Sequence, residues 1–139
     1  MTSRLNPYVN VLDGRAREAM EFYRSVLGGE LTVMTFGEMG AEGDVADQVM
    51  HAQLETPAGF TLMGADAPPE MAPVTPGDNI SISLSGDDVA ELTRWFEGLA
   101  EGGRVTTPLE RQVWGDHFGA LVDRYGIPWL VNISGASDG

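Results

Sequence analysis

The segment VMHAQLE (49–55) holds a histidine and a glutamine, His51 and Gln53, at the spacing that places both side chains on one face of a strand. Histidine changes its charge near neutral pH, so His51 could act as a general base or as a lone protein ligand of a metal ion. A hydrogen-bonded strand histidine without a chemical role is the alternative that the residue type leaves open. The second histidine, His117, follows Asp116 in the loop-like segment WGDHFG, and we interpret it as structural.

Alternation in the other predicted strands gathers more polar side chains on the same side as His51. Asn6, Tyr8 and Asn10 alternate with apolar residues over 6–12, and equivalent positions in the later strands are Thr61, Met63, Asn79, Ser81, Ser83, Leu130 and Asn132. A face left in water is normally rich in Lys, Glu and Arg, whereas this one is mostly neutral. We therefore expect it to line a small-molecule pocket, with a plain wet face of an antiparallel sheet as the alternative.

Two further groups of residues near this face have two interpretations each. Trp114 and Phe118 could stack on a flat ligand, or they could pack at the rim of the fold. The glycine-rich loop 37–48 carries Glu38, Glu42, Asp44 and Asp47, which form either a lid that attracts a cation or an ordinary solvated loop.

Composition excludes several classes of partner. The chain has 139 residues, a formal net charge of −13 and no cysteine. Such a charge repels nucleic acid and anionic membranes, so neither is predicted as a partner. No apolar run approaches the length of a membrane span, the first residues do not resemble a signal peptide, and disulfides are impossible, so we predict a cytoplasmic protein.

The predicted secondary-structure elements that must position these residues occur in the same order twice along the chain. A strand at 6–12, an apolar helical stripe from Ala16 to Leu27 and strands at 30–36, 49–55 and 60–65 are followed by a proline-rich linker at about 67–77. A strand at 79–85, a helix within 86–100 and strands at 104–109, 117–123 and 127–134 repeat that order. The repeat aligns Asn6 with Asn79, Val9 with Ile82 and Gly59 with Gly126, and a capping box of Ser85 with Asp88 is predicted to start the second helix.

These motifs also resemble a known family. The segments LNPYVNV, MTFGEM, VMHAQL, LMGADAPP and DRYGIPWLVN are similar to the PhnB-like branch of the vicinal oxygen chelate superfamily, which includes glyoxalase I, bleomycin-resistance proteins and extradiol dioxygenases. The resemblance implies metal ligands at a His opening the first strand of each module and at a Glu on the last strand of each. Here those positions are mapped to Asn6, Asn79, Met63 and Leu130, which are poor donors for zinc or harder divalent ions.

We therefore predict one α+β domain over 1–139, with tandem βαβββ modules at about 4–66 and 78–134 whose cupped mixed sheet carries its helices on the outer face. The predicted function is metal-independent small-molecule binding without a cofactor, as in resistance-type relatives, in a homodimer whose pockets include Tyr8, Asn10, His51, Ser81 and Phe118. The alternative is a glyoxalase- or lyase-like enzyme that uses His51 as base or as ligand of a displaced divalent metal. The methyltransferase activity assigned to some PhnB-like sequences is not expected, because no parallel α/β pattern with a glycine-rich turn is present.

Overall fold

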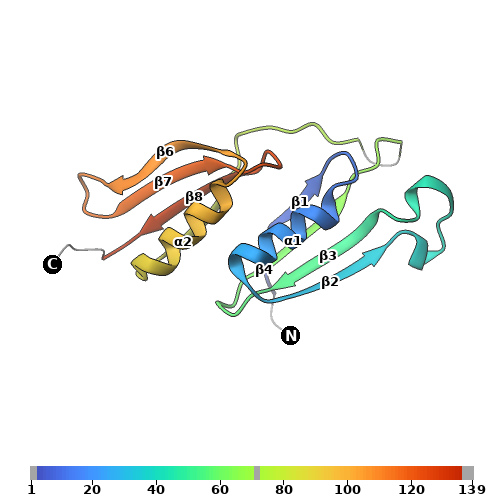
Figure 1. Ribbon diagram of the computed structural model, residues 1–139, viewed down its shortest axis with the longest axis horizontal. Helices are drawn as coiled ribbons and strands as arrows, with labels where there is room; N and C mark the ends of the chain where they lie inside the picture. The colour runs from blue at the N-terminus through green and yellow to red at the C-terminus, as the bar shows by residue number, and fades with distance from the viewer. Residues whose placement is uncertain (1–2, 71–72, 136–139) are drawn as a thin grey trace. The chain divides into compact units, whose positions relative to one another are not determined.

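The computed structural model describes residues 3–70 and 73–135, and the chain divides into two compact units, one ending at Thr75 and the other beginning at Pro76. The division falls within the predicted linker, of which residues 71 and 72 lie outside the described part, as do residues 136–139 at the end of the chain. Each unit has its own sheet and its own helix (Figure 1). Among the described residues, no helix is both long and apolar enough to cross a membrane.

The first unit is a βαβββ module. Its elements are β1 (Tyr8–Val11), α1 (Ala16–Leu27), β2 (Glu30–Thr35), two short 3₁₀ turns at Gly37–Met39 and Gly43–Val45, β3 (Val49–Glu55) and β4 (Thr61–Asp66). The strands form one mixed sheet in the order β1-β4-β3-β2, in which β1 runs parallel to β4 and the other neighbours are antiparallel. The two turns fall inside the loop predicted at 37–48.

The second unit repeats this plan. Its elements are β5 (Ile82–Gly86), α2 (Val89–Ala100), β6 (Arg104–Arg111), β7 (His117–Val122) and β8 (Pro128–Ile133), with sheet order β5-β8-β7-β6. Again the first strand is parallel to the last, and the remaining pairs are antiparallel. The predicted α+β fold with tandem βαβββ modules is confirmed, as two four-stranded mixed sheets.

Each helix packs on one face of its own sheet because its apolar residues recur at helical spacing. In α1 the buried residues are Ala16, Ala19, Met20, Tyr23 and Leu27. Gly64 in β4 lies directly beneath this helix: a Cβ there would come within 2.9 Å of the Met20 sulfur. The buried residues of α2 are Leu92, Trp95, Phe96 and Leu99. In unit 1, α1 therefore covers one face of the sheet and leaves the opposite face uncovered.

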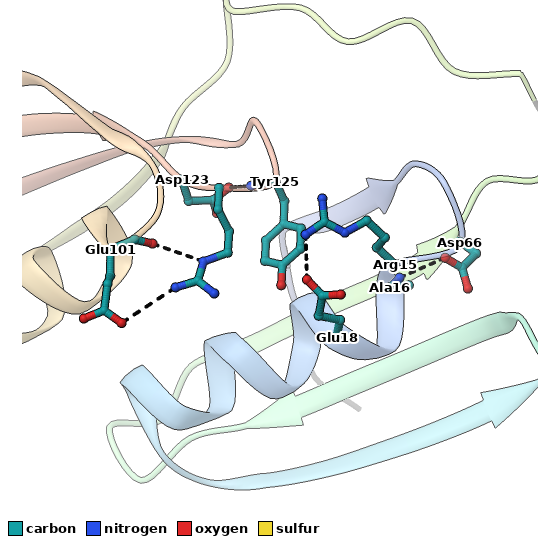
Figure 2. A network of polar contacts seen from close by, with 8 residues as sticks. Arg15, Ala16, Glu18, Asp66, Glu101, Asp123 and Tyr125 are labelled. Carbon is teal, nitrogen blue, oxygen red and sulfur yellow. Dashed lines mark hydrogen bonds and ion pairs between the residues drawn. The ribbon is translucent and has the colours of Figure 1, made fainter.

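The two helices begin in different ways. The carboxylate of Asp66, at the end of β4, accepts a hydrogen bond of 2.9 Å from the backbone N–H of Ala16 at the start of α1 (Figure 2). In α2 the side chain of the N-cap residue Asp88 accepts a hydrogen bond of 3.0 Å from the backbone N–H of Glu91. The predicted capping box of Ser85 with Asp88 is therefore wrong, because Ser85 belongs to β5 and Asp88 is itself the cap.

A pair of glycines follows each helix, at 28 and 29 after α1 and at 102 and 103 after α2, and in each pair the second glycine is required by a close approach of backbone. A Cβ on Gly29 would lie 2.1 Å from the carbonyl oxygen of Glu55, and one on Gly103 would lie 2.2 Å from that of Val122. Both carbonyls come from the end of the strand that starts the final hairpin of the module. The same steric requirement therefore holds in both modules and explains why the glycines recur.

The register of the first strands differs from the predicted alignment of the repeat. Tyr8 is paired with Met63 in unit 1, whereas Leu130, the counterpart of Met63, is paired with Ser83 in unit 2. Tyr8 is therefore equivalent to Ser83, and Val9 to Leu84 rather than to Ile82. Asn6 and Asn79 precede their strands and are not equivalent to each other. The predicted alignment of the first strands was wrong by two residues.

Candidate functional site

One row of side chains crosses all four strands of unit 1 on the face opposite α1. Ladder pairing places Tyr8 beside Met63, Met63 beside Gln53, and Gln53 beside Thr32. Directly paired residues in a sheet project from the same face, so these side chains form a continuous strip. Tyr8 remains 46% exposed, and Met63 and Gln53 are half-buried. The sequence predicted this strip apart from Thr32.

His51 lies next to this strip and contacts two of its members. The His51 and Tyr8 rings have centroids 5.8 Å apart and are tilted by 40°. The Nε2 atom of His51 lies 3.4 Å from Oε1 of Gln53. Asn10 is exposed on the same face, beside the small, buried Ala65. Tyr8, Asn10, His51, Gln53 and Met63 are thus brought together on one face of one unit.

Glu55, which was not predicted as a site residue, extends this cluster. Its carboxylate accepts a hydrogen bond from the amide of Gln53 and another, of 2.7 Å, from the hydroxyl of Thr61. The hydroxyl of Thr61 and then the amide of Gln53 lower the pKa of Glu55 below its usual value, because both stabilise the charged form. Its place on this face could have been predicted from its position, because Glu55 continues the i, i+2 series of His51 and Gln53 along β3.

The corresponding face of unit 2 has a different chemistry. Ser83, Leu130 and Ala120 form one row, and Ser85, Asn132 and Phe118 form the next. The amide of Asn132 donates a hydrogen bond of 3.0 Å to the carboxylate of Asp116, and no sequence motif predicted this contact. Trp114 is 61% exposed, and the centroid of its ring lies 6.4 Å from that of Phe118. Ser81 and Asn79 are exposed ahead of β5.

His117 does not share this face. It pairs with Ile133 and lines a cavity of about 330 Å³ on the α2 side of the sheet, together with Phe96 and Leu109. Its Nδ1 atom is buried and has no hydrogen-bond partner among the described residues. Mostly apolar walls with one histidine fit the interpretation of His117 as a packed residue.

The acidic loop 37–48 has a structural use for at least one of its carboxylates. Glu38 accepts hydrogen bonds of 2.7 Å from the N–H and 3.1 Å from the hydroxyl of Thr35, and the Glu38 N–H donates 3.2 Å back to that hydroxyl. The backbone bond, followed by the hydroxyl, lowers the pKa of Glu38. Its carboxylate therefore holds the turn after β2.

The residues at the family's metal positions do not form a fitting donor set. Met63 lies between Tyr8 and Gln53, and Leu130 lies between Ser83 and Ala120. The thioether of Met63, the alkyl chain of Leu130 and the carboxamides mapped to the other two positions, Asn6 and Asn79, are poor ligands for zinc or harder divalent ions. Within residues 3–70 and 73–135, no group of three or more His, Cys, Asp or Glu side chains is arranged to hold a metal ion.

Comparison with known proteins agrees with this fold. The family model described as the Glyoxalase/Bleomycin resistance protein/Dioxygenase superfamily matches residues 5–131. The chain belongs to this superfamily. The predicted membership of the vicinal oxygen chelate group is thereby confirmed.

Individual relatives span nearly the whole chain. Protein YjdN of Escherichia coli (strain K12) is 30% identical over 142 aligned residues, which cover 93% of this chain and 94% of YjdN. The crystal structure of protein PA1353 from Pseudomonas aeruginosa is 38% identical, with a TM-score of 0.79 and coverage of 94% of this chain and 98% of that one. A Bacillus cereus PhnB protein, described as a putative 3-demethylubiquinone-9 3-methyltransferase, shares the fold at 23% identity, with a TM-score of 0.67 and coverage of 95% and 100%.

Proposed function

We propose that this chain is a small-molecule-binding protein of the vicinal oxygen chelate fold that binds its ligand without a metal ion. The observation that carries this proposal is the strip of Tyr8, Met63 and Gln53 beside His51. Met63 stands in this strip at a position where the family resemblance implies a glutamate ligand in metal-using relatives. An aromatic ring, a thioether and an amide provide stacking, apolar contact and hydrogen bonds, which suit recognition of an organic molecule.

Charge narrows the ligand class. The chain carries a net charge of −13. The ionised Glu55 lies two residues from Gln53 along β3, beside its cross-strand neighbour Glu30. These charges favour neutral or cationic ligands over anions, because like charges repel across a partly desolvated face. A flat, neutral or cationic molecule with hydrogen-bonding groups at its edge therefore fits this face.

A ligand screen tests the proposal. A library of flat neutral, cationic and anionic compounds is tested by thermal shift, compounds that co-purify are identified by mass spectrometry, and both experiments are done with a chelator present. We expect a neutral or cationic hit whose affinity falls at least tenfold in Tyr8→Ala and is unchanged in Arg17→Ala, a control on the exposed side of α1. Hits that bind equally well to both variants would contradict the assigned face.

A glyoxalase- or lyase-like enzyme is the second candidate, favoured by the half-buried setting of His51 against Tyr8. Such an enzyme would use His51 to remove a proton next to a carbonyl group. Carbonyl compounds incubated in D₂O would then exchange that proton, as followed by NMR, in the wild type and in His117→Ala but not in His51→Ala. Equal exchange in all three proteins would reject this role of His51.

The proposed assembly is a homodimer. Strands β1 and β2 bound one sheet, and β5 and β6 bound the other, so each sheet has two edges that symmetric pairing could protect. Light scattering at micromolar protein should then give the mass of two chains. A monomer mass would contradict the dimer and leave the assigned binding face untouched.

A further inference from the structure

His51, Gln53 and Glu55 form a directional relay along one face of β3. The Nε2 atom of His51 is 3.4 Å from Oε1 of Gln53, and Nε2 of Gln53 donates to the Glu55 carboxylate. The hydroxyl of Thr61 donates a hydrogen bond of 2.7 Å to the other oxygen of that carboxylate. The three side chains are two residues apart, so the pleat of the strand itself keeps them in line.

Hydrogen-bonding capacity fixes the direction of this relay. An ionised carboxylate only accepts hydrogen bonds, so Gln53 must turn its NH₂ group toward Glu55. Its carbonyl oxygen then faces His51 and can only accept. The ring atom that meets it, Nε2, must therefore carry the hydrogen, because a neutral imidazole has one donor and one acceptor nitrogen.

We infer that Glu55 is a positioning residue that acts through Gln53 to hold His51 in the tautomer with its hydrogen on Nε2. Nδ1 is then the acceptor of the neutral ring. This inference rests on the proposed binding face. It adds one requirement to that proposal: the ligand must present an N–H or O–H donor to His51.

The surroundings of Nδ1 leave this acceptor available. His51 is half-buried, and the recorded contacts of its ring within residues 3–70 and 73–135 are those with Gln53 and Tyr8. Among the described residues, Nδ1 of His117 is buried without a hydrogen-bond partner, whereas Nδ1 of His51 is not enclosed in this way. A ligand on this face can therefore approach the lone pair.

Reversing the charge at position 55 tests the relay. An ammonium group only donates, so Glu55→Lys should turn the Gln53 oxygen toward residue 55 and its NH₂ toward His51. Nε2 would then become the acceptor, and the hydrogen would move to Nδ1. Because Glu30 lies opposite residue 55 and would compete for the ammonium, the comparison is made between Glu30→Gln and the double variant Glu30→Gln/Glu55→Lys.

Long-range ¹H–¹⁵N NMR of the ligand-free protein reports the tautomer directly, and the chain has only two histidines. Free imidazole rings of histidine also favour hydrogen on Nε2, so the decisive result is the change between the two variants. We expect the Nδ1 and Nε2 resonances of His51 to exchange their shift ranges in the double variant, while those of His117 stay in place. An unchanged tautomer of His51 would overturn the inference.

Removing the relay provides the matched control. In a Gln53→Met background, Glu55→Lys should have no effect on the His51 tautomer, and an effect of equal size there would also overturn the inference. Positions 30 and 55 are exposed, and the amide spectrum of each variant verifies its fold. Since no ligand is present, failure of this test leaves the binding proposal standing, and failure of the ligand screen leaves the relay standing.

Discussion

Asp66 binds the first residue of a helix that lies 50 positions earlier in the chain: its Oδ1 accepts a 2.9 Å hydrogen bond from the N–H of Ala16. Its Oδ2 accepts a second bond, of 2.7 Å, from the N–H of Val49 at the start of β3. The side chain of the residue just before α1, Arg15, makes no capping bond. One buried carboxylate thus satisfies a helix N-terminus and a strand end together, and orients β3, which carries His51.

Replacing this carboxylate should destabilise unit 1. Asp66→Ala leaves two buried N–H groups without acceptors, and hydrogen bonds to charged groups are worth roughly 1.5–3 kcal/mol each, so we expect a loss of about 3 kcal/mol. Asp88→Ala is the control, since it removes one exposed cap bond and should cost about 1 kcal/mol. Urea unfolding followed by circular dichroism measures both, and equal losses would contradict the role of Asp66.

Asp123 has the corresponding role in the β7–β8 turn. It accepts bonds from the N–H groups of Tyr125 and Ile127 at 2.8 and 3.1 Å, and from Nε1 of Trp129 at 2.9 Å. Asp123→Asn keeps one acceptor oxygen but can turn an NH₂ group toward the indole. We expect the indole N–H of Trp129 to exchange with solvent at least tenfold faster by NMR, while that of Trp95 is unaffected. Unchanged exchange at Trp129 would refute this assignment.

The glycines that end the two helices should not tolerate a methyl group. Gly29→Ala and Gly103→Ala each place a Cβ 2.1 or 2.2 Å from a backbone carbonyl oxygen, far inside a normal contact, and backbone cannot move aside cheaply. We expect thermal midpoints to fall by several degrees, corresponding to about 2 kcal/mol or more. Gly77→Ala is the control because the nearest atom to its Cβ would be 3.8 Å away.

The pKa of Glu55 should depend on its neighbours in a defined order. Thr61→Val removes the largest cause of its lowered pKa, so the value should rise toward the ordinary value of about 4.3. Since the folded pKa is depressed, the interaction stabilises the fold above the unfolded pKa and is lost as pH falls through the folded pKa. Carboxyl ¹³C shifts measure the titration. Thr32→Val, on the same face, should leave it unchanged.

The faces of the sheets could be predicted from the sequence, but the register of β1 and β5 could not. Side chains alternate with a period of two, so a shift of two residues leaves every side chain on its predicted face. This is why Tyr8 was placed on the correct side while its partner in the repeat was taken as Ser81 instead of Ser83. Only the ladder with β4 and β8 distinguishes these alignments.

The polar partners of the site were missed for a different reason. Glu55 ends a strand and precedes a turn, where an acidic residue is typical of a solvated surface. Asp66 caps a helix through a contact between residues far apart in the chain, and local capping rules consider only the neighbouring residues. In both cases the function of the carboxylate depends on a strand pairing that composition and periodicity do not specify.

Metal content is the most direct test of metal-independent binding. The protein is purified without chelator, its divalent metals are quantified by elemental analysis, and the ligand affinity of the same sample is compared before and after dialysis against a chelator. We expect well under one metal ion per chain and an unchanged affinity, because Tyr8, Met63, Gln53 and their counterparts in unit 2 are poor metal donors. One tightly held divalent ion per chain, with affinity lost on its removal, would contradict the account.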